Sequence, residues 1–137
     1  MRRIDVVYAL IYDDHQEKIL MVKNIRHNSF DFTLPGGGVE IGETLEQAVI
    51  RETKEETGFH IEVDGIVSIN EAFVKAKGHH AVFFTFLGRI IGGEMKISCP
   101  DEIADIVWMD LPTADQWLKN VPNGVKSTAP YLFEGIR

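Results

Sequence analysis

The chain has a single cysteine, Cys99, among its 137 residues, so the fold cannot depend on an internal disulfide. Long apolar runs are also missing, and none approaches the roughly 20 residues that a membrane-spanning helix needs. Asp5 and a polar cluster at residues 13–16 interrupt the apolar residues after the charged start, and no small-residue cleavage site follows. These absences predict a cytoplasmic protein without a membrane segment.

Positive charge is in short supply. The 14 lysines and arginines are outnumbered by 21 aspartates and glutamates, which gives a net charge of −7 at pH 7. The basic side chains are scattered, so the sequence predicts neither a nucleic-acid surface nor a polybasic membrane anchor. An acidic protein can still bind phosphates where metal cations bridge the two sets of negative charge. The expected partner is therefore a small molecule.

Length and composition predict one domain over residues 1–137, because 45% of the residues are hydrophobic. Apolar alternation and turn residues predict strands at 4–12, 18–23, 59–70, 81–91, 94–98 and 103–109. The strand at 18–23 returns after a turn at 13–16, and the one at 94–98 follows a Gly92-Gly93 turn. Residues 59–70 are one strand or two. A loop is expected at 24–31, a chain break at 35–38 and a helix at 112–119, and residues 120–137 are left unassigned. Together these elements predict an α+β fold.

The clearest predicted element is a helix between Thr44 and Gly58. Thr44 and Gln47 have the spacing of a capping box, in which each side chain bonds the other residue's backbone N–H. Gly58 suits the position after the last helical residue, where a left-handed backbone is common. The span is about 20 Å long at roughly 1.5 Å per residue.

This helix begins with an apolar face that becomes acidic. The apolar positions are Leu45, Ala48 and Val49. One and two turns further the same face reaches Glu52 and Glu56, with Glu55 at its edge. Carboxylates rarely occupy core-facing positions, and three like charges this close repel one another. A cation between them removes both objections.

The side chains around this face are hard oxygen ligands, which favours Mg²⁺ or Mn²⁺ over zinc. The glycines at 36–38 let the backbone approach a metal or phosphates, and Glu40 and Glu43 lie between them and the helix. Arg51 is placed to pair with a nearby carboxylate. Taken singly, a charged helix face is usually only solvated, and a glycine triplet is usually only a loop. Their joint spacing indicates a site.

The combined motif resembles the signature of the Nudix hydrolases: Gly, five residues, Glu, seven residues, Arg-Glu, an aliphatic residue, any residue, Glu-Glu, any residue, Gly and an aliphatic residue. Every fixed position matches, and only Thr53 and Phe59 depart from the aliphatic positions. The lead-in at 32–37 and the acidic-then-tryptophan segment at 101–109 also resemble the family. The matching positions are Gly37, Glu43, Arg51, Glu52, Glu55, Glu56 and Gly58.

The resemblance implies an α/β/α sandwich with a mixed central sheet and a loop–helix–loop motif. It also implies that Mg²⁺ or Mn²⁺ is held by Glu52, Glu55, Glu56 and the backbone carbonyl of Gly37. Glu43 and Arg51 would then orient the site. The family's reaction is attack of water on a phosphorus of a nucleoside diphosphate linked to another group. The general base varies among members, so Glu55, Glu56 and a glutamate outside the motif all remain candidates.

Glu102 is the candidate from outside the motif, and a solvated loop residue is an equal alternative. The candidate catalytic residues are therefore Glu52, Glu55, Glu56 and Glu102. A non-catalytic ligand sensor on the same fold and a plain metal-binding module are competing hypotheses. All motif glutamates are present, which favours an enzyme.

The substrate is the least determined property, because specificity lies in loops and pocket walls. Relatives acting on ADP-ribose often carry a proline after the motif, and those acting on dinucleoside polyphosphates often carry a tyrosine. Residues 61–78 contain neither. By elimination we expect a nucleoside triphosphate cut to monophosphate and pyrophosphate, with ADP-ribose and dinucleoside polyphosphates as alternatives. A homodimer is left open.

Overall fold

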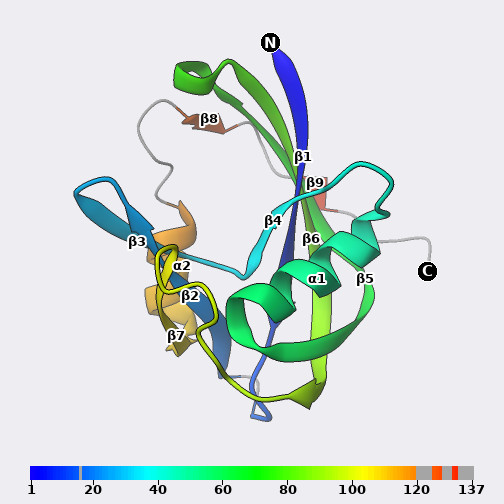
Figure 1. The fold of residues 1–137 in the computed structure, drawn as a ribbon, viewed down its shortest axis with the longest axis vertical. Helices are drawn as coiled ribbons and strands as arrows, with labels where there is room; N and C mark the ends of the chain where they lie inside the picture. Colours follow the sequence, from blue (N-terminus) through cyan, green and yellow to red (C-terminus); the bar gives the residue numbers. More distant parts are fainter. Residues whose placement is uncertain (16, 120–124, 128–130, 133–137) are drawn as a thin grey trace.

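A computed structural model describes residues 1–15, 17–119, 125–127 and 131–132 (Figure 1). The elements follow in the order β1 (Arg2–Ile11), β2 (Lys18–Arg26), β3 (Ser29–Thr33), β4 (Gly36–Gly38), α1 (Leu45–Thr57), β5 (Phe59–Val74), the 3₁₀ turn η1 (Lys75–Lys77), β6 (His79–Gly93), β7 (Ile103–Asp110), α2 (Leu111–Lys119), β8 (Val125–Ser127) and β9 (Tyr131–Leu132).

The strands form two sheets. The larger, six-stranded sheet has the order β4-β1-β6-β5-β8, with β9 also pairing with β5, and the smaller has the order β3-β2-β7. Within the larger sheet β1 runs parallel to β6, whereas the other pairs are antiparallel. The predicted α+β fold with a mixed sheet is confirmed, and a second sheet is added to it.

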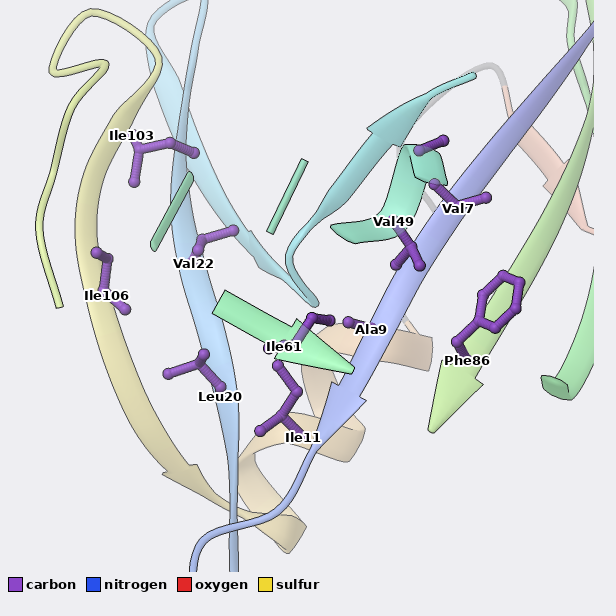
Figure 2. Close-up of a cluster of buried hydrophobic side chains, with 11 residues drawn as sticks. Val7, Ala9, Ile11, Leu20, Val22, Val49, Ile61, Phe86, Ile103 and Ile106 are labelled. Atoms are coloured by element: carbon purple, nitrogen blue, oxygen red, sulfur yellow. The ribbon is translucent and has the colours of Figure 1, made fainter. Parts of the chain in front are cut away.

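The two helices lie on opposite faces of the β1 and β2 region, which produces the predicted sandwich. Side chains of β1 alternate between two apolar clusters, as the two-residue period of a strand requires. Val7 packs into the cluster that contains Val49 of α1 (Figure 2). Tyr8 packs against the cluster that contains Ala114 of α2. Both faces of β1 are therefore used to bury apolar surface.

The returning strand expected after β1 is confirmed as β2, but the two strands belong to different sheets. The chain does turn back after Ile11, but the direct pairing is limited to one bridge between Tyr12 and Ile19. From there β1 pairs with β4 and β6, and β2 pairs with β3 and β7. Strand alternation indicates that a strand exists, but the choice of partner depends on segments far along the chain.

Two expectations were wrong. Residues 24–31 are not a loop, because β2 continues to Arg26 and β3 starts at Ser29, with the turn between them carried by Asn28 at φ 60°. Residues 94–98 form no strand; instead, the Lys96 N–H donates to the Thr57 carbonyl at 2.8 Å. That segment satisfies the end of α1 rather than pairing with β6.

No helix in the described residues is both long enough and apolar enough to cross a membrane. The cytoplasmic location stays a prediction from sequence.

Candidate active site

Helix α1 is held at both ends, as its sequence predicts. The Thr44 hydroxyl accepts from the Gln47 N–H at 3.0 Å, and the Gln47 side chain accepts from the Thr44 N–H at 2.9 Å. At the other end Gly58 has φ 82°, and its N–H donates to the Lys54 carbonyl. Because an added Cβ at Gly58 would collide with the Glu94 carbonyl, only glycine fits there. The caps place the helical carboxylates in fixed positions.

The buried face of α1 differs in part from the expected one. Thr53 and Thr57 are fully buried below Ala48 and Val49, whereas Glu52 and Glu56 lie half-buried at the border. The Thr57 hydroxyl donates to the Thr53 carbonyl at 2.7 Å, so a buried polar group is satisfied within the helix. Glu52 and Glu56 therefore face the glycines of β4 rather than the apolar core.

Glu52 lies directly against the backbone of Gly37. A Cβ built on Gly37 would stand 2.5 Å from the Glu52 carboxyl carbon and 2.6 Å from one of its oxygens. Real Cβ atoms do not come this close, so the absence of a side chain at Gly37 makes room for the carboxylate. The Gly37 position is set by pairing with Val7 of β1. The structure thus brings together two of the predicted metal-site residues.

Glu56 is anchored to the neighbouring glycine. The Gly36 N–H donates to the Glu56 carboxylate at 2.9 Å. Burial is the main reason that the pKa of Glu56 rises to about 7, and repulsion from Glu52, Glu102 and Glu55 adds to it. Burial also raises the pKa of Glu52, against the opposing charge of Arg51. Both carboxylates carry the electrostatic cost that a bound cation would remove.

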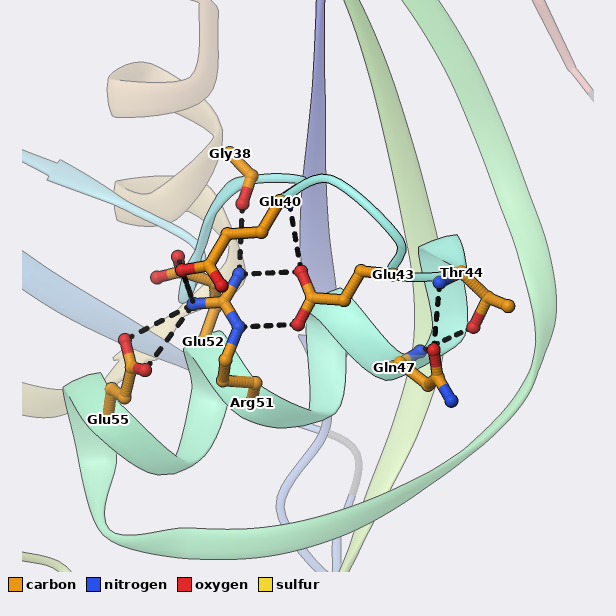
Figure 3. Close-up of polar contacts among 8 residues, drawn as sticks. All are labelled: Gly38, Glu40, Glu43, Thr44, Gln47, Arg51, Glu52 and Glu55. Atoms are coloured by element: carbon orange, nitrogen blue, oxygen red, sulfur yellow. Dashed lines mark hydrogen bonds and ion pairs between the residues drawn. The ribbon is translucent and has the colours of Figure 1, made fainter.

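Arg51 ties the loop before α1 to the helix (Figure 3). Its Nε and Nη2 donate to the two Glu43 oxygens at 2.6 and 2.8 Å, and Nη2 also donates to the Gly38 carbonyl at 3.1 Å. These bonds, followed by the Glu40 N–H, lower the pKa of Glu43 to about 2. The bidentate geometry is the strongest form of arginine–carboxylate pairing.

The remaining edge of the Arg51 guanidinium faces the helical glutamates. Nη1 donates to Glu52 at 2.9 Å and lies 3.4 Å from both oxygens of Glu55. Glu40 adds a longer ion pair at 3.6 Å. Arg51 therefore balances part of the acidic charge, and its own pKa is raised by these partners, Glu43 first.

The donor set suits a hard cation. Within the part of the chain that the structure describes, no three acidic, histidine or cysteine side chains already stand in ligand positions. The oxygens of Glu52 and Glu56 nevertheless lie on the adjacent backbone of Gly37 and Gly36, and Glu55 follows on the same helix. Carboxylate and carbonyl oxygens are the ligands that Mg²⁺ and Mn²⁺ prefer.

Glu102 comes into the same neighbourhood from the loop before β7. Its carbonyl accepts from the Ile25 N–H at 2.9 Å, and its own N–H donates to the Cys99 carbonyl at 3.0 Å. The side chain is exposed, and its charge contributes to the raised pKa of Glu56. The sequence named this residue as a candidate, with a solvated loop residue as an equal alternative, although it lies 46 positions from Glu56.

Beyond the motif, Tyr8 and Arg26 interact electrostatically with Glu56, and Asp31 pairs with Arg26. The Tyr8 ring lies against Gly36, since a Cβ there would approach it to 2.7 Å, and it stacks on Phe83 at 6.0 Å. Burial raises the pKa of Tyr8 to about 12, and the charge of Glu56 adds to this. For Arg26 the sequence did hold a signal: residues 20, 22, 24 and 26 share one face of β2. The expected loop at 24–31 ended that strand too early.

Comparison with known proteins gives concordant results. A family model described as the NUDIX domain matches residues 1–131. An ADP-ribose pyrophosphatase from Methanocaldococcus jannaschii is 37% identical over 100 residues, which cover 72% of this chain and 57% of that protein. The human 8-oxo-dGDP phosphatase NUDT18 is 37% identical over 93 residues, which cover 68% of this chain and 27% of that protein.

Among solved structures, a NUDIX hydrolase from Nitrosomonas europaea superposes with a TM-score of 0.75 at 26% identity, covering 85% of this chain and 78% of that one. The chain thus spans 57% and 27% of the lengths of the two curated relatives, and nearly four-fifths of the solved structure.

Proposed function

This chain belongs to the Nudix hydrolase family, a family acting on nucleotide-linked substrates, and from that premise we propose that it hydrolyses a phosphoanhydride bond in such a substrate. The reaction is attack of water on a phosphorus atom, and it requires a divalent metal, Mg²⁺ or Mn²⁺. The proposal concerns this chain and its own residues, because the curated relatives extend beyond it.

The observation that carries the proposal is the seating of Glu52 and Glu56 on the backbone of two successive glycines. Glu52 lies against Gly37, and Glu56 accepts from the Gly36 N–H. Glu52 is partly compensated by Arg51, whereas no ion pair with a cationic side chain is found for Glu56 among the described residues, although both carboxylates are half-buried. A cation bound by Glu52, Glu55, Glu56 and the Gly37 carbonyl would neutralise phosphate charge and activate water.

The other residues of the motif hold this arrangement. Arg51 pairs with Glu43 and donates to the Gly38 carbonyl, which ties the end of β4 to α1 and keeps the Gly37 backbone beside Glu52. Glu55, Glu56 and Glu102 are the candidates for the group that takes the proton from the attacking water. Glu102 differs from the helical pair because it comes from outside α1, in the loop before β7.

We favour a nucleoside triphosphate, normal or oxidised, as the substrate, with a monophosphate and pyrophosphate as products. The similarity to a protein named an 8-oxo-dGDP phosphatase supports a nucleotide with a damaged base. ADP-ribose is the second candidate, because the relative from Methanocaldococcus jannaschii is named an ADP-ribose pyrophosphatase. The absence of proline from residues 61–78 is the reason that it ranks second.

A substrate panel tests the proposal. Normal and oxidised nucleoside triphosphates, ADP-ribose, dinucleoside polyphosphates and capped RNA are incubated with Mg²⁺, with Mn²⁺ and with EDTA, and products are identified by mass with ¹⁸O-water as the oxygen source. We expect turnover only with metal. Unchanged turnover in EDTA would overturn the metal-dependent reaction. A tenfold higher kcat/KM for ADP-ribose, about 1.4 kcal/mol, would replace the preferred substrate but keep the reaction.

A non-catalytic sensor is the alternative in another class, and it would bind nucleotide without forming product from any substrate of the panel.

The cytoplasmic location and the homodimer remain predictions from sequence. Size-exclusion chromatography with light scattering tests the homodimer.

A further inference from the structure

The β2 strand carries a row of side chains that changes character as it approaches the site. Leu20 and Val22 are fully buried in the cluster that also contains residues of α1. The next positions of the same face are Asn24, which is 8% exposed, and Arg26, whose side chain is 51% exposed. An apolar row that ends in a buried amide and a half-exposed guanidinium indicates a polar surface at this end of the strand.

Arg26 does not move freely on that surface. Its Nε donates to one Asp31 oxygen at 2.8 Å and its Nη2 to the other at 3.1 Å. Asp31 is in turn held by the Asn24 amide, which donates to it at 2.9 Å and to the Thr33 hydroxyl at 2.8 Å. A guanidinium has five N–H groups, so about three remain to bind an outside acceptor. The guanidinium is therefore oriented before any ligand arrives.

Arg26 lies on the face of β2 that is turned toward α1, because Leu20 and Val22 on the same face pack in one cluster with Val49 of that helix. The positive charge of Arg26 lowers the pKa of Tyr8, and Tyr8 and Glu56, after Asp31, raise the pKa of Arg26. The geometry agrees, because the strand that carries Asp31 leads within three residues to Gly36, which touches the Tyr8 ring and bonds Glu56. Arg26 and the carboxylates of α1 thus face a common space.

The charges around that space explain what Arg26 is suited to bind. Arg51 is already shared among Glu43, Glu52 and Glu55, whereas Arg26 has one carboxylate partner and a half-exposed head group. A polyphosphate entering an acidic site needs fixed positive charge wherever the metal does not reach. A planar guanidinium with free N–H groups binds phosphate oxygens in a paired, directional way.

We infer that Arg26 is a substrate-binding residue, which holds an outer phosphate of the nucleoside polyphosphate beside the carboxylate cluster, with Asp31 and Asn24 as its positioning residues. This inference rests on the proposed function. The competing explanation is that the Arg26–Asp31 pair only stabilises the β2–β3 hairpin.

Kinetics of Arg26→Gln and Arg26→Lys separate the two explanations. With the best substrate of the panel and Mg²⁺, Arg26→Gln should raise KM at least about tenfold, or about 1.4 kcal/mol, while kcat stays within about threefold. The inhibition constant of inorganic pyrophosphate should rise by a similar factor. Arg26→Lys should lie between, because it keeps the charge but loses the planar fork.

Arg89→Gln is the matched control. The Arg89 side chain on β6 is 61% exposed and, like Arg26, pairs with a carboxylate, that of Glu62. It lies away from the glycines of β4. We expect its KM and pyrophosphate inhibition to equal those of the unmodified protein. Thermal unfolding of all three variants shows how much each ion pair contributes to the fold.

The outcomes decide between the explanations. If Arg26→Gln lowers the unfolding temperature but leaves KM and pyrophosphate inhibition unchanged, Arg26 only holds the hairpin and the inference is wrong. If no panel substrate is turned over, the proposed function fails by itself. In that case calorimetric titration with Mg²⁺-pyrophosphate still tests Arg26, since weaker binding by Arg26→Gln than by Arg89→Gln supports it and equal binding overturns it.

Discussion

Two arginine–carboxylate pairs lie next to the acidic end of α1, and they differ in what they leave exposed. Arg51 and Glu43 are 23% and 15% exposed, and the guanidinium is shared with Glu52 and Glu55. Arg26 and Asp31 are 51% and 23% exposed, and the guanidinium has one carboxylate partner. The same chemical pair therefore has two structural settings: the enclosed one joins a loop to a helix, and the open one leaves N–H donors exposed to solvent.

The difference also follows from how each pair is built. Arg51 and Glu43 are eight residues apart on one loop–helix unit. Arg26 and Glu56 are 30 residues apart, and they interact electrostatically only because the strands between them fold back. Substitutions that act on one region and spare the other test this comparison.

The largest effect is expected at the two half-buried carboxylates of α1, Glu52 beside Arg51 and Glu56 on the side of Arg26. Glu56→Gln should lower kcat by at least about 100-fold, more than the 10–100-fold typical of outer partners of a metal site, because it removes a proposed ligand. Glu52→Gln should behave alike, and both variants should keep the fold. Turnover is measured at saturating Mg²⁺, with the exposed Glu46→Gln on the same helix as control. Near-normal kcat in both Glu52 and Glu56 variants would place the site elsewhere.

The next effect separates Gly37 from Gly38, two adjacent glycines of β4. Gly37→Ala places a methyl group within 2.6 Å of a Glu52 oxygen, whereas Gly38→Ala meets nothing within 4 Å. We expect Gly37→Ala to lower kcat/KM more than about tenfold, since small displacements of reacting groups are costly, and Gly38→Ala to be nearly neutral. Equal activity of the two variants would show that the Glu52–Gly37 contact has no role.

A smaller effect is expected at Glu102, which approaches from outside the helix. If it takes the proton from water, Glu102→Gln should lower kcat about tenfold or more and change KM little. The neighbouring exposed Asp101→Asn provides the control. If both constants stay within about twofold, Glu102 is an ordinary surface residue.

The smallest effect concerns stability, where Glu43 and Glu56 should have opposite pH dependence. The pKa of Glu43 falls from 4.5 to about 2, so its stabilising contribution is present above about 4.5 and is lost as the pH falls toward 2. The pKa of Glu56 rises from 4.5 to about 7, so its ionisation destabilises the fold progressively as the pH rises through that window.

Urea unfolding in EDTA between pH 2 and pH 8 measures both slopes. Glu43→Gln should flatten the loss of stability at acid pH, and Glu56→Gln should gain stability over the unmodified protein as the pH approaches 7. Mg²⁺ should shrink that gain by stabilising the ionised carboxylate. Parallel curves for Glu56→Gln and the unmodified protein would contradict the burial of this group.

Local features of this protein were predictable from sequence. The capping box, the terminal glycine and the i, i+3, i+4 spacing of Glu52, Glu55 and Glu56 all act within one helix, so the sequence determined the helix and the clustering of its carboxylates. The matching motif added Gly37, Glu43 and Arg51, and the structure brings all of them together. Their catalytic and metal-binding roles stay predictions until the variants are measured.

Pairing between distant segments was decided only by the tertiary structure. The loop expected at 24–31 and the strand expected at 94–98 were wrong, and the partners of the first two strands were not predicted, because local propensity does not say which strand becomes a neighbour. Arg26 fell in the expected loop at 24–31, whereas the structure puts it at the end of β2, in the other sheet from Gly36. The sequence by itself determined the spacing of the carboxylates on α1. The packing of the two sheets decided that the strand face carrying Arg26 is turned toward that helix.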